Sequence, residues 1–197
     1  GLVSVTATDP DNATLEGTGT VSRSTTIGDR GTISPGVGDF NMSNFNINAA
    51  STMETFASGG TYRWEVNKLP ASGTAGVNWD TVTFNALAIT ATSGSKFTIN
   101  VVSLNVAGNA AGSLAGLSGV FGTQYRWSIA LNGSMTGFAL DSFNIDASAF
   151  SADQPGYWKV GFTGNNLDVV LTVPEPSSAV TVGAMAGAAL LRRRRRA

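Results

Sequence analysis

The 197-residue chain contains neither cysteine nor histidine, and only 13% of its residues are charged. Without cysteine, disulfide bonds and thiol chemistry are excluded. Without histidine, the commonest general base and metal ligand is missing, and a Ser-His-Asp triad cannot form. The chain also has no Gly-x-x-x-x-Gly-Lys loop to hold nucleotide phosphates. These absences exclude several large classes of enzyme.

Charge is unevenly distributed along the chain. Residues 1–173 contain 12 acidic and 7 basic side chains, a net charge of −5, whereas five consecutive arginines lie close to the C-terminus. The net charge of −1 for the whole chain therefore hides an acidic body. Because that body has no basic stripe, nucleic acid is not an expected partner.

The composition is typical of an exported, β-rich protein. Glycine is abundant, with 24 residues, and Ser, Thr and Asn are frequent between apolar positions. Residues 1–173 suffice for one sizeable domain. The first residues contain no basic segment followed by an apolar one, so we expect that a secretory signal has been removed or lies outside this chain.

Several stretches alternate apolar and polar residues with a period of two, and they lie at 62–66, 81–85, 97–101 and 167–173. Their β-branched and aromatic residues, interrupted by Gly, Ser and Asn, predict strands separated by turns. No long stretch of residues 1–173 has a helical period. The predicted fold class is therefore all-β.

In residues 17–60, isolated apolar residues are separated by Gly, Thr, Ser and Asn. Residues 31–36 are predicted to form a turn between narrow strands. Narrow polar strands with frequent turns suit the coils of a β-solenoid, in which each rung stacks on its neighbour. The alternative is a β-sandwich or jelly roll, of which this segment would be the loop-rich edge. The pattern leaves both architectures open.

Three physically different segments make up the last 24 residues. Pro174, Glu175 and Pro176 cannot belong to a helix, because proline lacks a backbone donor and restricts the residue before it. An apolar run from Ala179 to Leu191 predicts a short helix that suits lipid. The run is followed by Arg192, Arg193, Arg194, Arg195 and Arg196, which the positive-inside rule keeps in the cytoplasm.

The apolar run is short for a membrane-spanning helix. Its 13 residues would extend about 20 Å as a helix, against a hydrocarbon core of about 30 Å. Snorkelling arginines and local thinning of the bilayer can make up part of the difference. This length predicts transient anchoring in the inner membrane rather than permanent spanning.

The order, spacing and C-terminal position of these segments resemble the PEP-CTERM sorting signal of Gram-negative and related bacteria. The resemblance implies that Pro174, Glu175 and Pro176 form the sorting and cleavage motif and that the arginines stop the chain at the membrane. It implies an exosortase that cleaves near the motif and releases or transfers the exported body. It also implies two regions, a β-rich body of residues 1–173 and a sorting signal of residues 174–197.

The body is similar to sequences of other PEP-CTERM surface proteins and to passenger regions built from autotransporter-associated β-strand repeats. The similarity lies in residues 31–36, 60–66, 76–82, 87–91 and 135–138. Such passengers imply a right-handed parallel β-helix. They imply an architecture and a location, not a reaction.

Acidic residues are candidates for catalysis of glycoside hydrolysis, because this reaction needs two facing carboxyl groups about 5–10 Å apart. The candidates are Glu54, Glu65, Asp80, Asp141, Asp146 and Asp153. No spacing ties any two of them together, and we expect acidic groups on strands to be solvated. Asp80 is expected to stabilise a turn, and Asp9-Pro-Asp11-Asn12 is expected to be a turn rather than a calcium loop. No catalytic residue, cofactor or metal site is predicted.

Aromatic rings could form a platform for sugars. Trp64 and Trp127 belong to two similar Tyr-Arg-Trp runs and share a strand face with apolar neighbours, so both rings are expected in the core. Arg63 and Arg126 are expected on the opposite, solvated face. Trp158, which follows a Pro-Gly turn and has tyrosine and lysine as neighbours, is the best candidate for stacking on a glycan.

The sequence therefore predicts a non-enzymatic protein, exported to the cell surface or into an exopolysaccharide matrix, with a structural or adhesive body. Its expected partners are an exosortase, the inner membrane during sorting, exopolysaccharide, and further copies of itself through exposed strand edges. The alternatives are a carbohydrate-binding module and, third, a polysaccharide-degrading enzyme.

Overall fold

The computed structural model describes residues 2–7, 11–38, 40–42, 44–47, 53–117, 121–152 and 156–175. Within these ranges the protein is all-β, as predicted, and its one helical element is the short 3₁₀ helix η1 (Leu140–Ser142). The predicted apolar helix Ala179–Leu191 and the arginines Arg192–Arg196 lie outside the described residues. Within the described part, no helix is long and apolar enough to cross a membrane.

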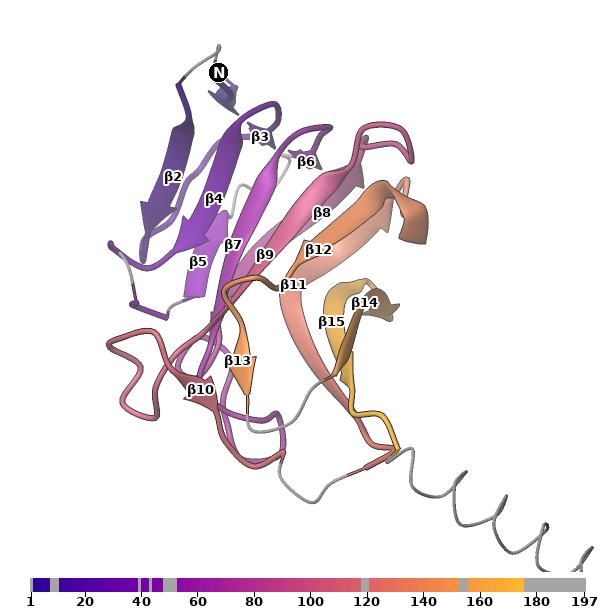
Figure 1. Ribbon diagram of the computed structural model, residues 1–197. Helices are drawn as coiled ribbons and strands as arrows, with labels where there is room; N and C mark the ends of the chain where they lie inside the picture. Colours follow the sequence, from indigo (N-terminus) through magenta and orange to yellow (C-terminus); the bar gives the residue numbers. More distant parts are fainter. Residues whose placement is uncertain are drawn as a thin grey trace, which may run out of the picture.

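Two sheets contain most of the strands (Figure 1). The first, called sheet A here, consists of β1 (Val3–Val5), β3 (Thr25–Ile27), β5 (Asn44–Ile47), β6 (Met53–Phe56), β8 (Thr81–Ile89), β11 (Gln124–Thr136), β14 (Tyr157–Thr163) and β15 (Asn166–Thr172). Sheet B consists of β2 (Ala13–Gly17), β4 (Gly31–Pro35), β7 (Thr61–Val66), β9 (Phe97–Ser103) and β12 (Phe143–Asp146). A small pair is formed by β10 (Ser113–Leu114) and β13 (Ser151–Ala152).

Sheet order follows chain order, and most consecutive strands alternate between the two sheets, except that β5 and β6 both lie in sheet A. Sheet B has the order β2-β4-β7-β9-β12, and all its pairs are parallel. Sheet A has the order β1-β3-β6-β8-β11-β15-β14, with β5 also paired to β8. All pairs among the strands β1 to β12 within these two sheets are parallel, although β5 pairs with β8 and not with the preceding strand β3.

The parallel pattern ends at a hairpin. Strands β14 and β15 pair antiparallel to each other, and β15 also pairs antiparallel with the first half of β11. The second half of β11 pairs parallel with β8. Sheet A is therefore mixed, and the hairpin covers the end of it that lies farthest from β1.

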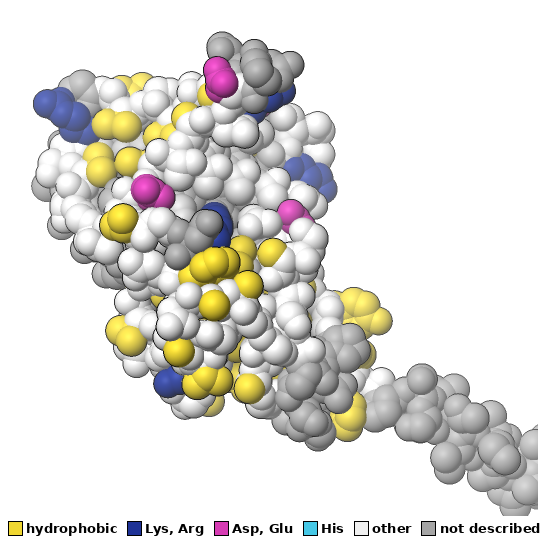
Figure 2. Space-filling view, turned by 60° about the vertical axis from the view of Figure 1, so that its left-hand side comes forward, with side chains coloured by type: hydrophobic (Ala, Val, Ile, Leu, Met, Phe, Trp, Pro, Cys, Tyr) yellow, Lys and Arg dark blue, Asp and Glu magenta, His cyan; other side chains and the backbone are white. Residues whose placement is uncertain are grey.

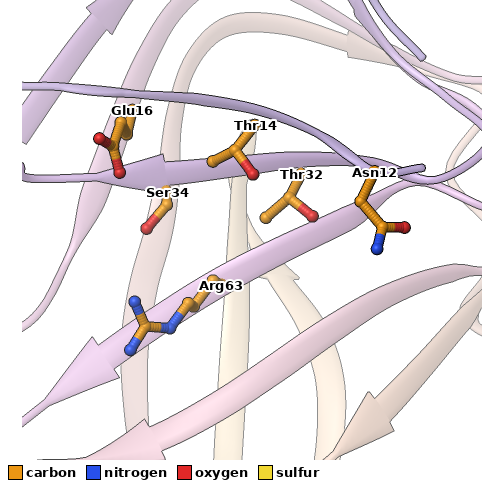
Figure 3. A pocket seen from close by; sticks show the side chains of 6 residues that line it. All are labelled: Asn12, Thr14, Glu16, Thr32, Ser34 and Arg63. Carbon is orange, nitrogen blue, oxygen red and sulfur yellow. The ribbon is translucent and has the colours of Figure 1, made fainter. Parts of the chain in front are cut away.

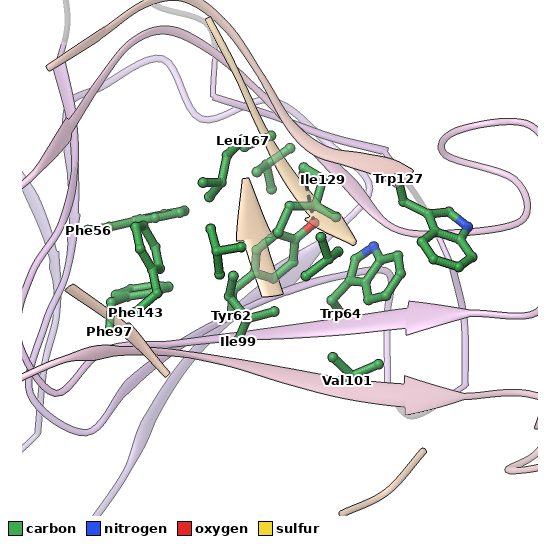
Figure 4. Close-up of a cluster of buried hydrophobic side chains, with 14 of the residues drawn as sticks. Phe56, Tyr62, Trp64, Phe97, Ile99, Val101, Trp127, Ile129, Phe143 and Leu167 are labelled. Carbon is green, nitrogen blue, oxygen red and sulfur yellow. Dashed lines mark hydrogen bonds between the residues drawn. The ribbon is translucent and has the colours of Figure 1, made fainter. Parts of the chain in front are cut away.

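The core lies between the two sheets and is rich in aromatic rings (Figure 4). Tyr62, Trp64 and Trp127 are fully buried, which confirms the core positions predicted for the two tryptophans. Trp64 comes from sheet B and Trp127 from sheet A, and their ring centroids are 5.7 Å apart. The two similar Tyr-Arg-Trp runs therefore fill one core from opposite sheets.

One acidic side chain lies on the buried face of sheet A. Glu54 is 2% exposed, on the same face of β6 as Phe56. Its Oε2 accepts a 2.6 Å hydrogen bond from the backbone N–H of Thr25, whereas its Oε1 has no hydrogen-bond partner in the described part of the structure. Burial raises the pKa of Glu54 from 4.5 to about 7, although the bonds from Thr25 oppose this shift.

The raised pKa of Glu54 predicts that the protein is more stable at mildly acidic pH. The folded state binds the proton of Glu54 more tightly than the unfolded state does, so this contribution is complete below pH 4.5 and is lost as the pH rises through 7. A shift of this size corresponds to about 3 kcal/mol. Urea unfolding at pH 5 and pH 8 measures it.

The variant Glu54→Gln cannot ionise and should lose this part of the pH dependence. The matched variant Glu16→Gln, at an exposed position, should keep it. If the wild-type protein and Glu54→Gln lose the same free energy of unfolding between pH 5 and pH 8, Glu54 is not the group responsible.

Candidate functional site

The outer face of sheet B is a polar surface built by the parallel register. Ile33, Tyr62 and Ile99 lie in one register row and are fully buried, so the residues beside them in sequence project outward. These outward residues form the threonine row Thr14, Thr32, Thr61 and Thr98, one on each of four neighbouring strands. Successive members lie about 4.8 Å apart across the sheet, the spacing of paired strands.

A second row lies two residues further along the same strands. It contains Glu16 and Ser34, which are register partners, then Arg63, Asn100 and Asp146, which are register partners across β7, β9 and β12. Asn100 donates a 3.0 Å hydrogen bond to Asp146. The backbone N–H of Ser148 also bonds Asp146, and this bond is the main reason why the pKa of Asp146 is lowered.

These two rows border a hollow of about 610 Å³ over β2, β4 and β7 (Figure 3). All the described side chains that line it are polar or charged: Asn12, Thr14, Glu16, Thr32, Ser34 and Arg63. We call this hollow the polar groove. Ser34 lies between Glu16 on one side and Arg63 on the other.

The Arg63 guanidinium is held in place by a buried carboxylate. Its Nη2 lies 2.9 Å from Oε1 of Glu65, which is 1% exposed, and its Cζ lies 5.9 Å from the ring centroid of Phe40. Glu65 also accepts hydrogen bonds from the backbone N–H groups of Phe40 and Asn41, at 3.0 and 2.9 Å. One carboxylate therefore fixes both the cation of the polar groove and the loop beside it.

The loop that Glu65 holds has an unusual backbone. Phe40 has a φ of 62°, a conformation that a bulky side chain rarely adopts, and its N–H is bonded to Glu65. Gly36 has a φ of 100°, and a Cβ placed there would lie only 1.8 Å from the carbonyl oxygen of Asn41. The two bonds to Glu65 help to hold the loop in this conformation.

Asp80 supports the other side of Glu65. Its Oδ2 accepts a 3.0 Å hydrogen bond from the backbone N–H of Glu65, and its backbone oxygen accepts one from the indole of Trp64. Asp80 thus ties the end of β7 to the segment that enters β8. The role is structural, as its sequence context predicts, but these bonds join Asp80 to β7 and not to the turn that precedes it.

The predicted solvation of the acidic candidates is wrong for three of them. Glu54, Glu65 and Asp80 are at most 2% exposed, because backbone N–H groups and Arg63 provide the partners that water would otherwise supply. Glu65 and Asp80 are brought together, and both are occupied by structural bonds. Asp141 is exposed, as expected, and Asp153 lies outside the described residues.

The predicted solvation of the two arginines holds for Arg126, whose side chain is 43% exposed, and needs correction for Arg63, whose side chain is 22% exposed. Arg63 is paired with Glu65, as described above. Arg126 lies 2.7 Å from the fully buried Asp168, which also accepts 2.7 Å hydrogen bonds from Ser128 and Thr163. Both arginines do lie on the face opposite their tryptophans, but buried carboxylates hold them there.

Trp158 lies in an aromatic cluster. It is half-buried, and its ring centroid is 4.8 Å from that of Phe150 and 5.8 Å from that of Trp127. It also borders a second hollow, of about 310 Å³, lined mainly by residues of β12 and β14 such as Phe143 and Val160. The predicted stacking on a glycan could therefore involve only the part of the Trp158 ring that borders this hollow. Its neighbour Tyr157 is far more exposed, at 70%.

The predicted sorting motif begins directly after the last strand. Val173 is buried, and its backbone N–H and C=O bond Thr123 and Gly122. Pro174 is half-buried and Glu175 is exposed. Pro176 lies outside the described residues.

Elsewhere the described surface offers few charged groups. Figure 2 shows charged side chains sparsely distributed over one face and hydrophobic side chains gathered in its lower half. In the described ranges, no group of three or more acidic side chains is placed to hold a metal ion. Asp9, the first residue of the predicted calcium-like turn, lies outside these ranges.

In comparisons with known proteins, no protein-family model matches the sequence, and no curated protein is significantly similar to it.

The contacts of Glu65 predict that its charge stabilises the loop at Phe40. The variant Glu65→Gln should lower the free energy of unfolding by about 1–3 kcal/mol, the usual cost of removing a charged hydrogen-bond partner. It should also speed chymotrypsin cleavage after Phe40 in the folded protein. Chemical unfolding and timed proteolysis with mass spectrometry measure the two effects.

The matched control for this prediction is Glu16→Gln, which removes an exposed carboxylate from the same face. It should change neither stability nor cleavage appreciably. Equal effects of the two variants would show that Glu65 has no special role.

Proposed function

We propose that the chain is an exported, non-enzymatic surface protein whose β body is delivered by a C-terminal sorting signal of the PEP-CTERM type. The observation that carries this proposal is the position of the motif. Pro174 and Glu175 follow the last strand with no intervening linker, and Glu175 is exposed. A processing enzyme that cuts there would remove the apolar run and the arginines without breaking any strand of the body.

We further propose that the body is a right-handed parallel β-helix, ended by an antiparallel hairpin. Its support is that the chain passes repeatedly between two sheets from β1 to β12 and that these strands pair parallel within each sheet. A β-sandwich of the immunoglobulin or jelly-roll kind consists of antiparallel sheets instead. Handedness follows from the strong right-handed preference of parallel crossover connections.

A non-enzymatic role is consistent with the structural hydrogen bonds that the buried carboxylates make. Glu65 and Asp80 are the two acidic candidates that lie together, and backbone N–H groups and Arg63 occupy them. A glycosidase needs two carboxyl groups that face a sugar. The body is better suited to display a surface, either in the exopolysaccharide matrix or in contacts between copies of the protein.

The sorting proposal predicts a processed C-terminus. Intact-mass spectrometry of the surface protein from its native host should show a chain that ends near residues 174–178. A Pro174→Ala/Glu175→Ala variant should keep its arginine tail and remain in the inner-membrane fraction, because the motif that the exosortase reads is gone.

A matched control is Asn165→Ala, at an exposed turn between β14 and β15. It should be processed as the wild-type protein is. Wild-type protein that reaches the surface with all five arginines attached would contradict the proposal.

A carbohydrate-binding module is the second candidate function, and the polar groove on sheet B is the observation that favours it.

A further inference from the structure

The polar groove contains a hydroxyl group, that of Ser34, which makes no hydrogen bond within the described part of the chain. Ser34 as a whole is only 4% exposed, but its Oγ is not among the buried atoms that lack a hydrogen-bond partner, so this unpaired hydroxyl reaches the hollow. A hydroxyl that is unpaired, accessible and directed into a hollow is free to bond a ligand or ordered water.

The residues around Ser34 offer further hydrogen-bonding groups. No hydrogen bond joins the hydroxyls of Thr14 or Thr32 to another described residue, and these hydroxyls can both donate and accept. Glu16 adds an acceptor, and Arg63 adds a cation whose position Glu65 and Phe40 fix. Donors and acceptors are therefore interleaved on a rigid sheet.

The lining also limits what kind of ligand fits. Among the described residues no apolar side chain lines the groove, so a lipid or an apolar peptide would gain little from it. Glu65 offsets the charge of Arg63, and Glu16 would repel an anion. A ligand rich in hydroxyl groups and without net charge matches this lining best. The volume of about 610 Å³ lies within the range typical of small-molecule sites.

The register extends the surface beyond the groove. The threonine row continues from Thr32 to Thr61 and Thr98, with one hydroxyl on each strand at spacings of about 4.8 Å. A linear polymer of sugars laid across the strands would meet a hydroxyl at every strand. A compact ligand would use the groove alone.

We infer that the polar groove and the threonine row bind a neutral polysaccharide chain that runs across the strands of sheet B, with Ser34 and Thr32 as its central contacts. The inference deepens the proposed function, because it names the partner of a matrix protein. It does not depend on processing of the tail, since binding can be measured with purified protein.

Affinity electrophoresis in native gels tests this inference, with hydroxyethyl cellulose, laminarin and dextran as neutral probes and polygalacturonate as an anionic comparison. At least one neutral probe should retard the full chain. The variant Thr32→Val/Ser34→Ala should bind that probe about tenfold more weakly, because it removes two hydrogen-bonding groups.

Two variants provide controls. Thr55→Val removes a hydroxyl from the outer face of sheet A, where Thr55 is half-buried and likewise has no side-chain bond within the described ranges, and it should bind as the wild type does. Thr32→Ser keeps the hydroxyl of the threonine row and should retain most of the binding. Melting temperatures of all variants separate loss of binding from loss of folding.

Several outcomes would overturn the inference. These are retardation by polygalacturonate alone, retardation by no probe, and equal weakening in Thr32→Val/Ser34→Ala and Thr55→Val. Self-association that only Thr32→Val/Ser34→Ala abolishes, without binding of any glucan, would instead make this face a contact between copies of the chain. None of these results bears on cleavage at the sorting motif, so the two proposals can fail separately.

Discussion

The parallel register of sheet B is the constraint on which the rest of the structure depends. Side chains alternate along a strand, so a slip of one residue would exchange the buried and exposed faces. With Ile33, Tyr62 and Ile99 stacked inward, Thr32 and Thr98 can only face outward. One set of strand pairings therefore forms both the aromatic core and the regular polar surface opposite it.

Buried carboxylates hold loops and side chains that strand pairing alone does not hold. Glu65 holds the strained loop at Phe40 and the guanidinium of Arg63, and Asp168 gathers Arg126 together with two hydroxyl groups. In a chain with so few charges, removing a partner from either carboxylate would leave a buried charge uncompensated, which is expensive. The hydrogen-bond donors around Glu65 and Asp168 account for the presence of buried carboxylates at these positions. No reacting molecule is needed to explain them.

Much of the fold could be predicted from the sequence, because period-two alternation and buried tryptophans are local signals. The all-β class and the core positions of Trp64 and Trp127 followed from them. The polar groove did not, although Thr and polar residues recur two apart at 14 and 16, 32 and 34, and 98 and 100. The intervals between these pairs are unequal, so only the register shows that they align. The burial of Glu65 was missed for a similar reason, since its donors at residues 40 and 41 are distant in sequence.

The hairpin of β14 and β15 makes the two ends of the body chemically different. Its antiparallel strands close sheet A beside β11, so a further parallel coil could not be added there without displacing them. Extra coils could be inserted between existing ones, where each new strand would find parallel neighbours on both sides. Proteins of this design could thus grow longer over evolution while the distance from the hairpin to Pro174 stayed constant. Length of the displayed surface and delivery of the chain would then evolve independently.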